Sequence, residues 1–193
     1  MIFATGNEGK MKEIRTIMAD FCREIYSMKE AGIEINVEEN GQTYEENALI
    51  KARAVAVHTQ DLVLADDSGL EIDWLNGEPG VYSARYMGED TSYRVKNANL
   101  ISRLEGVPEE KRTARFVCAI AAVLPGGREL TVRAAIEGRI GYEEKGDNGF
   151  GYDPIFFVPE IGKTTAELGE AEKNRISHRG KALGLMKEEL GKL

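Results

Sequence analysis

Two adjacent carboxylates, Asp66 and Asp67, have the placement most typical of a catalytic site in this sequence. They follow the apolar run Leu62–Ala65 and precede Ser68 and Gly69. At the end of a buried strand, neighbouring carboxylates repel each other and lose solvation, which a divalent cation would relieve. Mg²⁺ prefers such oxygen ligands and typically joins one or two carboxylates to substrate phosphates. The alternative is a structural turn in which Asp and Ser side chains bond the local backbone.

The segment Thr5–Lys10 is a candidate phosphate loop. It follows the short apolar run Ile2–Ala4 and opens a predicted helix, so its N–H groups and the helix dipole can converge on an anion. Its two glycines permit close approach, and Lys10 adds a charge. The segment is not a Walker A loop, because Ala4 stands where the first glycine is required and Met11 replaces Ser or Thr. An ordinary strand-to-helix turn with a solvated lysine is the alternative.

Two later segments have the composition of a nucleobase site. The glycine-flanked Phe150–Asp153 offers aromatic rings that can stack on a base and a carboxylate that can accept from a base N–H. Lys173 and the pair His178-Arg179 offer donors to a base carbonyl or a phosphate. Packing of the rings on the following strand, and solvation of the cations near a helix end, are the structural alternatives.

Other charged residues are weaker candidates. Glu38 and Glu39 could supply a further metal ligand or could be two solvated acids in a loop. Arg85 lies between aromatic residues and could reach a phosphate or form a surface ion pair.

Composition limits the class of protein. Lys and Arg number 25 against 33 Asp and Glu among 193 residues, a net charge of −8. This balance argues against a broad nucleic-acid or anionic-membrane surface, which needs a positive field. The two cysteines, Cys22 and Cys118, have no CxxC spacing, which favours a reducing compartment. No run approaches the ~20 apolar residues of a membrane span, so a cytoplasmic protein is expected.

The order of apolar segments predicts an α/β fold with a mixed sheet flanked by helices. Strand–helix alternation opens the chain, and Pro125-Gly126-Gly127 marks a later hairpin between two long β-rich runs. Thr43 and Glu46 have capping-box spacing before an Ala-rich helix. Strands are predicted at residues 2–4, 24–28, 62–65, 70–74, 115–124 and 130–136, and helices after residue 10, at 43–57, at 91–105 and from 177.

Six motifs together resemble the inosine triphosphate pyrophosphatase family, whose members remove aberrant purine nucleotides. The resemblance covers almost the whole chain, and the shared order and spacing of the motifs make it specific. The motifs are Thr5-Gly6-Asn7-x-Gly9-Lys10, Thr43-x-x-Glu46-Asn47-Ala48, Ala65-Asp66-Asp67-Ser68-Gly69-Leu70, Pro79-Gly80-Val81-Tyr82-Ser83-Ala84-Arg85-Tyr86, Gly149-Phe150-Gly151-Tyr152-Asp153-Pro154 and Ser177-His178-Arg179-Gly180.

The resemblance implies hydrolysis of ITP, dITP and XTP to the monophosphate and pyrophosphate, with Mg²⁺. It also implies an elongated two-lobed fold with a central active-site cleft, a homodimer, and one pyrophosphatase domain over residues 1–193. By position, Asp67 is the expected general base and a metal ligand, with Glu39 as a further ligand. The family often has Glu-Thr-Gly where this chain has Glu39-Asn40-Gly41 after Glu38, so Glu38 stays an alternative. The expected substrate-binding residues are Thr5, Gly6, Asn7, Glu8, Gly9, Lys10, Ser68, Phe150, Gly151, Tyr152, Asp153, Lys173, His178 and Arg179.

The expected reaction is attack of water on the α-phosphorus. Asp67 would take the proton, and Lys10 with the loop N–H groups would hold the leaving pyrophosphate. Two alternatives stay open: a pyrophosphatase for other modified nucleotides, and a non-catalytic nucleotide sensor. The paired acids argue against a sensor, because binding a polyanion gains little from extra carboxylates without a metal.

Overall fold

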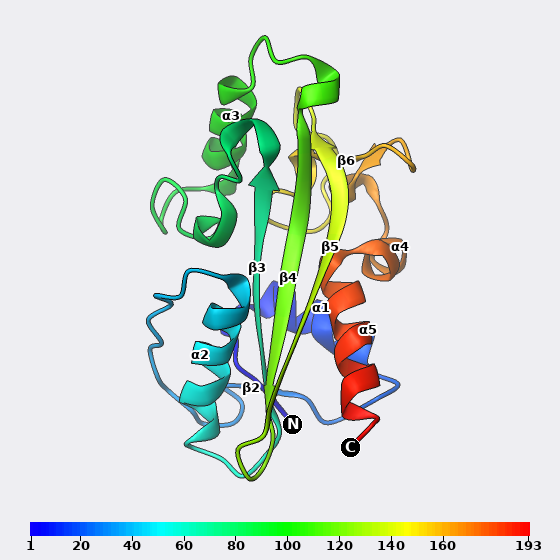
Figure 1. Ribbon diagram of the computed structural model, residues 1–193. Helices are drawn as coiled ribbons and strands as arrows, with labels where there is room; N and C mark the ends of the chain where they lie inside the picture. Colours follow the sequence, from blue (N-terminus) through cyan, green and yellow to red (C-terminus); the bar gives the residue numbers. More distant parts are fainter. The chain divides into compact units, whose positions relative to one another are not determined.

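The computed structural model describes residues 1–193 and contains one seven-stranded mixed sheet (Figure 1). Strand β1 is parallel to β2 and β3, whereas β6 is antiparallel to β5 and β7. The strand order is β2-β1-β3-β4-β5-β6-β7. The predicted α/β fold with a mixed sheet is therefore confirmed. The strands are β1 (Ile2–Phe3), β2 (Tyr26–Ser27), β3 (Val63–Ile72), β4 (Thr113–Val123), β5 (Glu129–Ile140), β6 (Phe156–Val158) and β7 (Lys163–Thr164).

Five α-helices accompany the sheet, and polar side chains cap the N-termini of two of them. The side-chain oxygen of Asn7 accepts from the backbone N–H of Lys10 at 3.0 Å. The predicted capping box is present, since Thr43 accepts from the Glu46 N–H at 3.1 Å and Glu46 accepts from the Thr43 N–H at 3.3 Å. None of the helices is long and apolar enough to cross a membrane. The helices are α1 (Glu8–Met18), α2 (Tyr44–Ala56), α3 (Tyr93–Arg103), α4 (Glu170–Ile176) and α5 (His178–Leu190).

The chain divides into two compact units, each assembled from separate stretches of sequence. Unit 1 comprises Met1–Ser68, Cys118–Ala134 and Arg179–Leu193, and unit 2 comprises Gly69–Val117 and Ala135–His178. Strands β3, β4 and β5 contribute residues to both units.

Unit 1 is a sheet covered on both faces, with α2 on one side and α1 and α5 on the other (Figure 1). Alternation along the strands divides the core accordingly. Phe3 and Leu64 pack with α1 and α5, whereas their neighbours Ile2 and Val63 pack with α2. The helices contribute Met, Ala and branched aliphatic side chains to these layers. Buried helix residues include Met11, Ile14 and Met18 from α1, Ala48, Ala52 and Val55 from α2, and Ala182, Leu183 and Met186 from α5.

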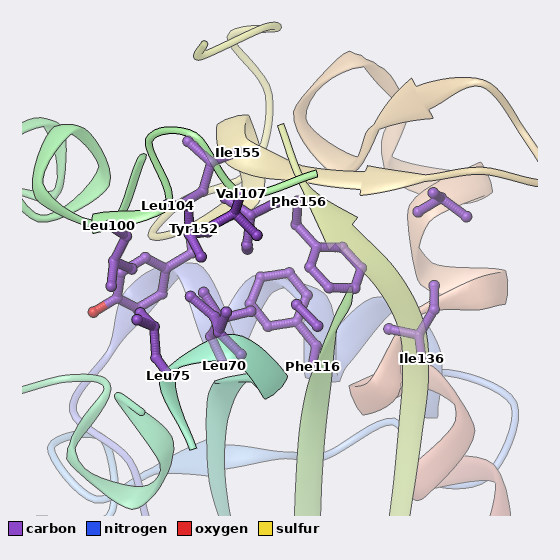
Figure 2. Packing of buried hydrophobic residues seen from close by; sticks show 14 residues of the cluster. Leu70, Leu75, Leu100, Leu104, Val107, Phe116, Ile136, Tyr152, Ile155 and Phe156 are labelled. Carbon is purple, nitrogen blue, oxygen red and sulfur yellow. The ribbon is translucent and has the colours of Figure 1, made fainter. Parts of the chain in front are cut away.

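Unit 2 has a separate core in which aromatic rings are prominent (Figure 2). Phe116 of β4 contacts Phe156 of β6 with ring centroids 4.3 Å apart. Leu100 and Leu104 from α3 and the segment after it are fully buried in the same cluster. This core holds β4, β6 and α3 together in unit 2, and it includes Tyr152 of the candidate Phe150–Asp153 loop.

One sequence prediction about the elements is wrong, and one helix was not predicted. The predicted turn at Asp66–Gly69 is part of the continuous strand β3, because its backbone stays in the sheet and its carboxylates find cationic or amide partners. The predicted helix from residue 177 is confirmed as α5, but the separate helix α4 before it, which carries Lys173 and ends at Ser177 in an extended conformation, was not predicted. Ser177 therefore separates two helices.

Candidate active site

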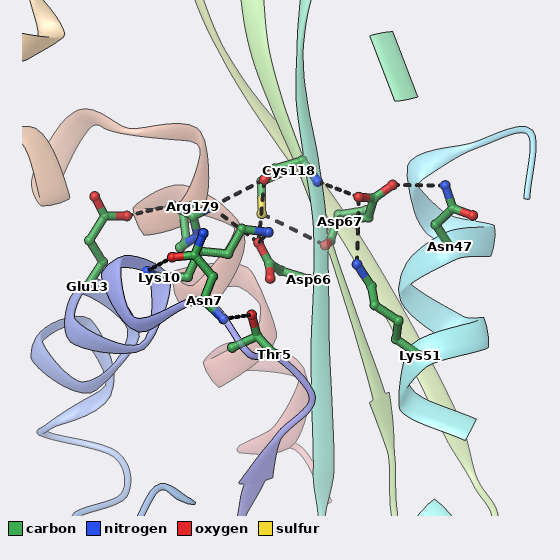
Figure 3. Close-up of polar contacts among 12 residues, drawn as sticks. Thr5, Asn7, Lys10, Glu13, Asn47, Lys51, Asp66, Asp67, Cys118 and Arg179 are labelled. Atoms are coloured by element: carbon green, nitrogen blue, oxygen red, sulfur yellow. Dashed lines mark hydrogen bonds and ion pairs between the residues drawn. The ribbon is translucent and has the colours of Figure 1, made fainter. Parts of the chain in front are cut away.

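Asp66 and Asp67 point to opposite faces of β3 (Figure 3). This follows from the strand conformation, in which successive side chains alternate between faces. Both residues lie just past the point where β1 stops pairing with β3, since Phe3 is paired with Leu64. The two carboxylates therefore do not share a face of the sheet, and each has its own partners.

Asp66 is a buried anion held by two cations. Only 1% of the residue is exposed, and its Oδ2 lies 3.0 Å from Nζ of Lys10 and 3.2 Å from Nη2 of Arg179. Burial by itself would raise the pKa of Asp66, but Lys10, Arg179 and Lys51 outweigh it and hold the pKa well below its usual range. Asp66 is thus ionised at neutral pH and positions cations rather than accepting a proton.

Arg179 belongs to the same buried cluster. Its guanidinium donates to a carboxylate oxygen of Glu13 and, at 3.2 Å, to the hydroxyl of Ser68. Burial lowers the pKa of Arg179 and the neighbouring Asp66 raises it, with a net rise. The structure therefore places Arg179 with the phosphate-loop lysine in unit 1, whereas the sequence prediction grouped it with the base-binding residues.

Asp67 faces α2 and has a different environment. Its Oδ2 accepts from the side-chain amide of Asn47 at 3.1 Å, and its Oδ1 lies 3.7 Å from Nζ of Lys51. Burial raises the pKa of Asp67, Lys51 opposes that rise, and the charge of Glu39 adds to it, so the net shift is upward. A carboxylate with a raised pKa is a better proton acceptor.

Glu39 and Asp67 both form ion pairs with the ammonium group of Lys51. Lys51 Nζ lies 2.8 Å from Glu39 Oε2, while Glu38 is exposed. Burial would lower the pKa of Lys51, but Asp66, Asp67 and Glu39 raise it overall. No group of three or more His, Cys, Asp or Glu residues is placed to hold a metal ion. Two convergent carboxylates nevertheless fit an ion that takes one or two protein ligands and completes its shell with water and phosphate.

The Thr5–Lys10 loop is largely exposed to solvent and is stabilised by hydrogen bonds between its own residues. Thr5 Oγ1 accepts from the Asn7 N–H at 3.2 Å, and residues Gly6 to Gly9 are exposed. The loop leads from β1 into α1, whose first-turn N–H groups have no partner within a helix. The exposed amides and Lys10 are thus arranged as an anion site at a helix N-terminus.

In unit 2, the carboxylate of Asp153 accepts hydrogen bonds that stabilise the Phe150–Asp153 loop. Its Oδ2 accepts from the Phe150 N–H at 2.9 Å and from Lys173 Nζ at 2.7 Å, and its Oδ1 accepts from the Thr165 hydroxyl at 2.7 Å. Gly149 has φ +76°, and a Cβ there would lie 2.2 Å from Asp153 Oδ2. These contacts show how the loop conformation and the position of Lys173 depend on one carboxylate.

The two rings of this loop have different exposure. Tyr152 is 4% exposed, donates to the Ser83 carbonyl at 2.6 Å and packs edge-on against Tyr93 at 5.1 Å. Phe150 is only half-buried, with Lys173 Nζ 5.0 Å from its ring centroid. Tyr152 therefore supports the loop, and Phe150 is the ring available to a ligand.

His178 and Gly151 have structural contacts within unit 2. The His178 imidazole stacks on Phe116, with centroids 4.8 Å apart and an interplanar angle of 20°. The Gly151 carbonyl accepts from the side-chain amide of Asn97 at 3.3 Å. Both residues are thus held in place by neighbours outside their own motifs.

Sequence reasoning did not select Asn47, Lys51 or Glu13. Asn47 and Lys51 are four residues apart on α2, so they share the face that meets Asp67. Polar side chains at this spacing in an Ala-rich helix were an available signal. No local sequence pattern indicates a role for Glu13, because its partner Arg179 is 166 positions away in the chain.

Comparisons with known proteins cover the whole chain. A family model described as the Ham1 family matches residues 1–189. A relative from Caldanaerobacter subterraneus subsp. tengcongensis, named dITP/XTP pyrophosphatase, is 51% identical over 189 residues, which are 97% of this chain and 94% of the relative. A relative of the same name from Desulforamulus reducens is 50% identical over 193 residues, which are 100% of this chain and 96% of the relative.

Solved structures agree with the sequence relatives. The Ham1 protein from Coxiella burnetii superposes with a TM-score of 0.89 and 39% identity, over 100% of this chain and 98% of that chain. The Ham1 protein from Staphylococcus aureus gives a TM-score of 0.87 and 40% identity, over 98% and 97% of the two chains. The predicted family resemblance is confirmed, and the chain belongs to the Ham1 family.

Proposed function

We propose that the chain hydrolyses the α–β phosphoanhydride bond of ITP, dITP and XTP, releasing the nucleoside monophosphate and pyrophosphate. The observation that carries the proposal is that two consecutive acids have different partners and oppositely shifted pKa values. Asp66 is an ionised anchor for Lys10 and Arg179, whereas Asp67 has a raised pKa beside Lys51 and Glu39. The names of the relatives, dITP/XTP pyrophosphatase, support the same reaction.

Glu39 and Asp67 are the proposed ligands of a divalent metal, for which Mg²⁺ is the best fit. Both present hard oxygen donors to one ammonium group, so both can reach one cation. Glu39 is preferred over Glu38 because Glu38 is exposed. A bound Mg²⁺ would neutralise phosphate charge and lower the pKa of nearby water.

The protein's own residues then have separate roles. Asp67 accepts a proton from the water that attacks the α-phosphorus, and Asn47 holds the carboxylate in place through its 3.1 Å hydrogen bond. Lys10 and the exposed N–H groups of the Thr5–Gly9 segment bind the leaving pyrophosphate. Ser68 and Arg179 keep Asp66, and through it Lys10, in position.

The nucleobase is proposed to bind residues of unit 2. Phe150 offers a half-buried ring for stacking, while Gly151, Tyr152 and Asp153 shape the loop that presents it. Lys173 and His178 supply polar groups suited to a 6-oxo group. Arg179 stays a predicted base contact from the family resemblance, although the structure engages its guanidinium with Asp66, Glu13 and Ser68.

Residues 1–193 are proposed to act as a single pyrophosphatase domain and to form a homodimer in the cytoplasm, without nucleic-acid partners. The single-domain proposal is supported by the construction of the units, since unit 1 comes from three stretches of chain and unit 2 from two. No single cut in the chain would separate the two units. The net charge of −8 supports the absence of nucleic-acid partners.

The proposal is tested by incubating the protein with ITP, XTP, GTP, ATP and a set of modified pyrimidine nucleoside triphosphates in Mg²⁺ and separating the products. We expect monophosphate and pyrophosphate from ITP and XTP, with much slower turnover of ATP. Diphosphate and orthophosphate would show cleavage of a different bond. Activity confined to modified pyrimidine nucleotides, or tight ITP binding without any product, would favour the two alternative functions.

A further inference from the structure

The buried side chains from Lys173 to His178 are all polar, while Ile176 is partly buried against the core of unit 2. Lys173, Asn174, Ser177 and His178 are 6%, 9%, 4% and 7% exposed, whereas Arg175 is exposed. Lys173 and Asn174 are consecutive residues of α4, Ser177 is the extended residue that ends this helix, and His178 opens α5. Helices normally bury an apolar stripe, because polar side chains lose their hydration on burial. A buried polar segment is therefore suited to binding a polar ligand.

Asn174 differs from its neighbours in this segment in one respect. Both polar atoms of its carboxamide, Nδ2 and Oδ1, are buried and have no hydrogen-bond partner. Most buried side-chain polar atoms in proteins are paired, and an exception calls for an explanation such as a functional role or a bound water or ion. The carboxamide therefore holds an unused donor and an unused acceptor next to each other.

The position of Asn174 in the helix connects it to the proposed base-binding residues. It follows Lys173, whose Nζ is fixed 2.7 Å from Asp153 and lies 5.0 Å from the Phe150 ring centroid. A 6-oxopurine presents a carbonyl acceptor and an N1–H donor side by side on one edge. A carboxamide matches that edge, because its N–H can donate to the 6-oxo oxygen while its oxygen accepts from N1–H.

We propose that Asn174 is a specificity-determining residue that reads the 6-oxo and N1–H edge of the purine through these two hydrogen bonds. The inference rests on the proposed function for its substrate class. Asn174 is not among the base-binding residues proposed above, and it lies between Lys173 and His178 in the sequence.

A suitable comparison substrate must lack both of the purine groups that the carboxamide can bind. A carboxamide rotated by half a turn presents donor and acceptor in the reverse order, which suits adenine, so ATP is a poor probe of this contact. Purine riboside triphosphate has neither the 6-oxo group nor the N1–H. The ratio of kcat/KM for ITP to that for purine riboside triphosphate therefore isolates the two hydrogen bonds.

The test compares the wild type with Asn174→Leu, which has similar volume and no polar atoms. We expect kcat/KM for ITP to fall about 10- to 100-fold, the effect of losing paired hydrogen bonds in a buried site. Turnover of purine riboside triphosphate should change less than about 3-fold, because that substrate has no partner for the amide. Thermal stability should be unchanged or higher, since a buried unpaired amide is removed. The matched control Arg175→Ala, on the exposed side of the same helix, should change none of these values.

An unchanged ratio between the two substrates in Asn174→Leu would overturn the proposal, as would an equal loss of both activities. If Asn174→Leu does not fold, Asn174→Ser provides the same ratio with a shorter side chain. If the wild type releases no pyrophosphate from ITP, the proposed function fails. Asn174 is then tested through the Kd values of both triphosphates for wild type and variant, and equal ratios would overturn its role.

Discussion

Nζ of Lys10 lies 3.0 Å from Oδ2 of Asp66, so the cation of the phosphate loop is tied to a carboxylate on the central strand β3. The same oxygen receives Arg179 from the other end of the chain, at 3.2 Å. A single buried anion thus joins α1, β3 and α5 within unit 1 (Figure 3). Its removal would leave two cations without their counter-ion.

Asp66→Asn should destabilise the protein by about 3–5 kcal/mol at pH 7, because removing one partner of a buried ion pair leaves uncompensated charge. Urea unfolding measures this effect, with the exposed Asp90→Asn as the control. The folded-state pKa of Asp66 lies below the ordinary value of 3.8 for an aspartate, so the unfolded chain binds the proton first as pH falls. Stability from Asp66 is present above about pH 4 and lost below it. The variant should therefore show a weaker loss of stability below pH 4, and an identical loss would contradict this account.

Asp67→Asn should lower kcat for ITP by about 10²–10⁴-fold while leaving the fold intact, because an amide cannot accept the proton of the attacking water. Steady-state kinetics and circular dichroism measure the two parts of the prediction. Near-normal turnover would remove Asp67 from the role of general base.

Lys51→Met should raise the pKa of the Asp67 carboxyl in the metal-free protein. The ammonium of Lys51 opposes the rise caused by burial and by Glu39, so its removal leaves those effects uncompensated. An NMR titration of the Asp67 carboxyl carbon, performed with a chelator present, gives the value directly. A downward shift would show that Lys51 does not stabilise the Asp67 anion.

Gly149→Ala should disrupt the Phe150–Asp153 loop. Its Cβ would lie 2.2 Å from Asp153 Oδ2, which must then leave the Phe150 N–H or Lys173. We expect a loss of roughly 10-fold in kcat/KM for ITP, about 1.4 kcal/mol of transition-state binding. Gly162→Ala is the control, since Gly162 has a similar φ of +73° but no atom within 4 Å of the added Cβ. Equal effects of the two substitutions would show that backbone strain alone is responsible.

Arg112→Met should destabilise the protein by about 3 kcal/mol through unit 2, because three carbonyl groups in buried or partly buried contacts each lose a hydrogen-bond donor. Arg112 is 1% exposed and donates to Ile140 at 2.8 Å and to Leu104 and Gly141 at 2.7 Å. The exposed Arg94→Met should change the free energy of unfolding by less than about 0.5 kcal/mol. Similar urea midpoints for the two variants would contradict the structural role of Arg112.

Local sequence signals predicted much of the fold correctly. The capping box at Thr43 and the hairpin after β4 were predictable because their determinants lie within a few residues of each other. The Asp66–Gly69 segment was misassigned, because Asp, Ser and Gly favour turns locally, whereas here strand pairing and long-range charge partners determine the conformation.

The site was predictable where motif residues act locally and unpredictable where partners are distant. Thr5, Asn7 and Lys10 form a loop from consecutive residues, and the sequence predicted that loop. The pairing of Asp66 with Arg179 spans 113 positions, and no local pattern specifies it. The placement of Arg179 in unit 1 could therefore come only from the structure.

The position of Arg179 and α5 in unit 1 has a consequence for biosynthesis. Residues of α5 complete the core layer that α1 begins, although the two helices are separated by most of the chain. During translation, Asp66 and Lys10 leave the ribosome long before Arg179 is made. The nascent chain therefore exposes an unfinished apolar layer until residues 179–193 emerge, and high contact order of this kind slows folding.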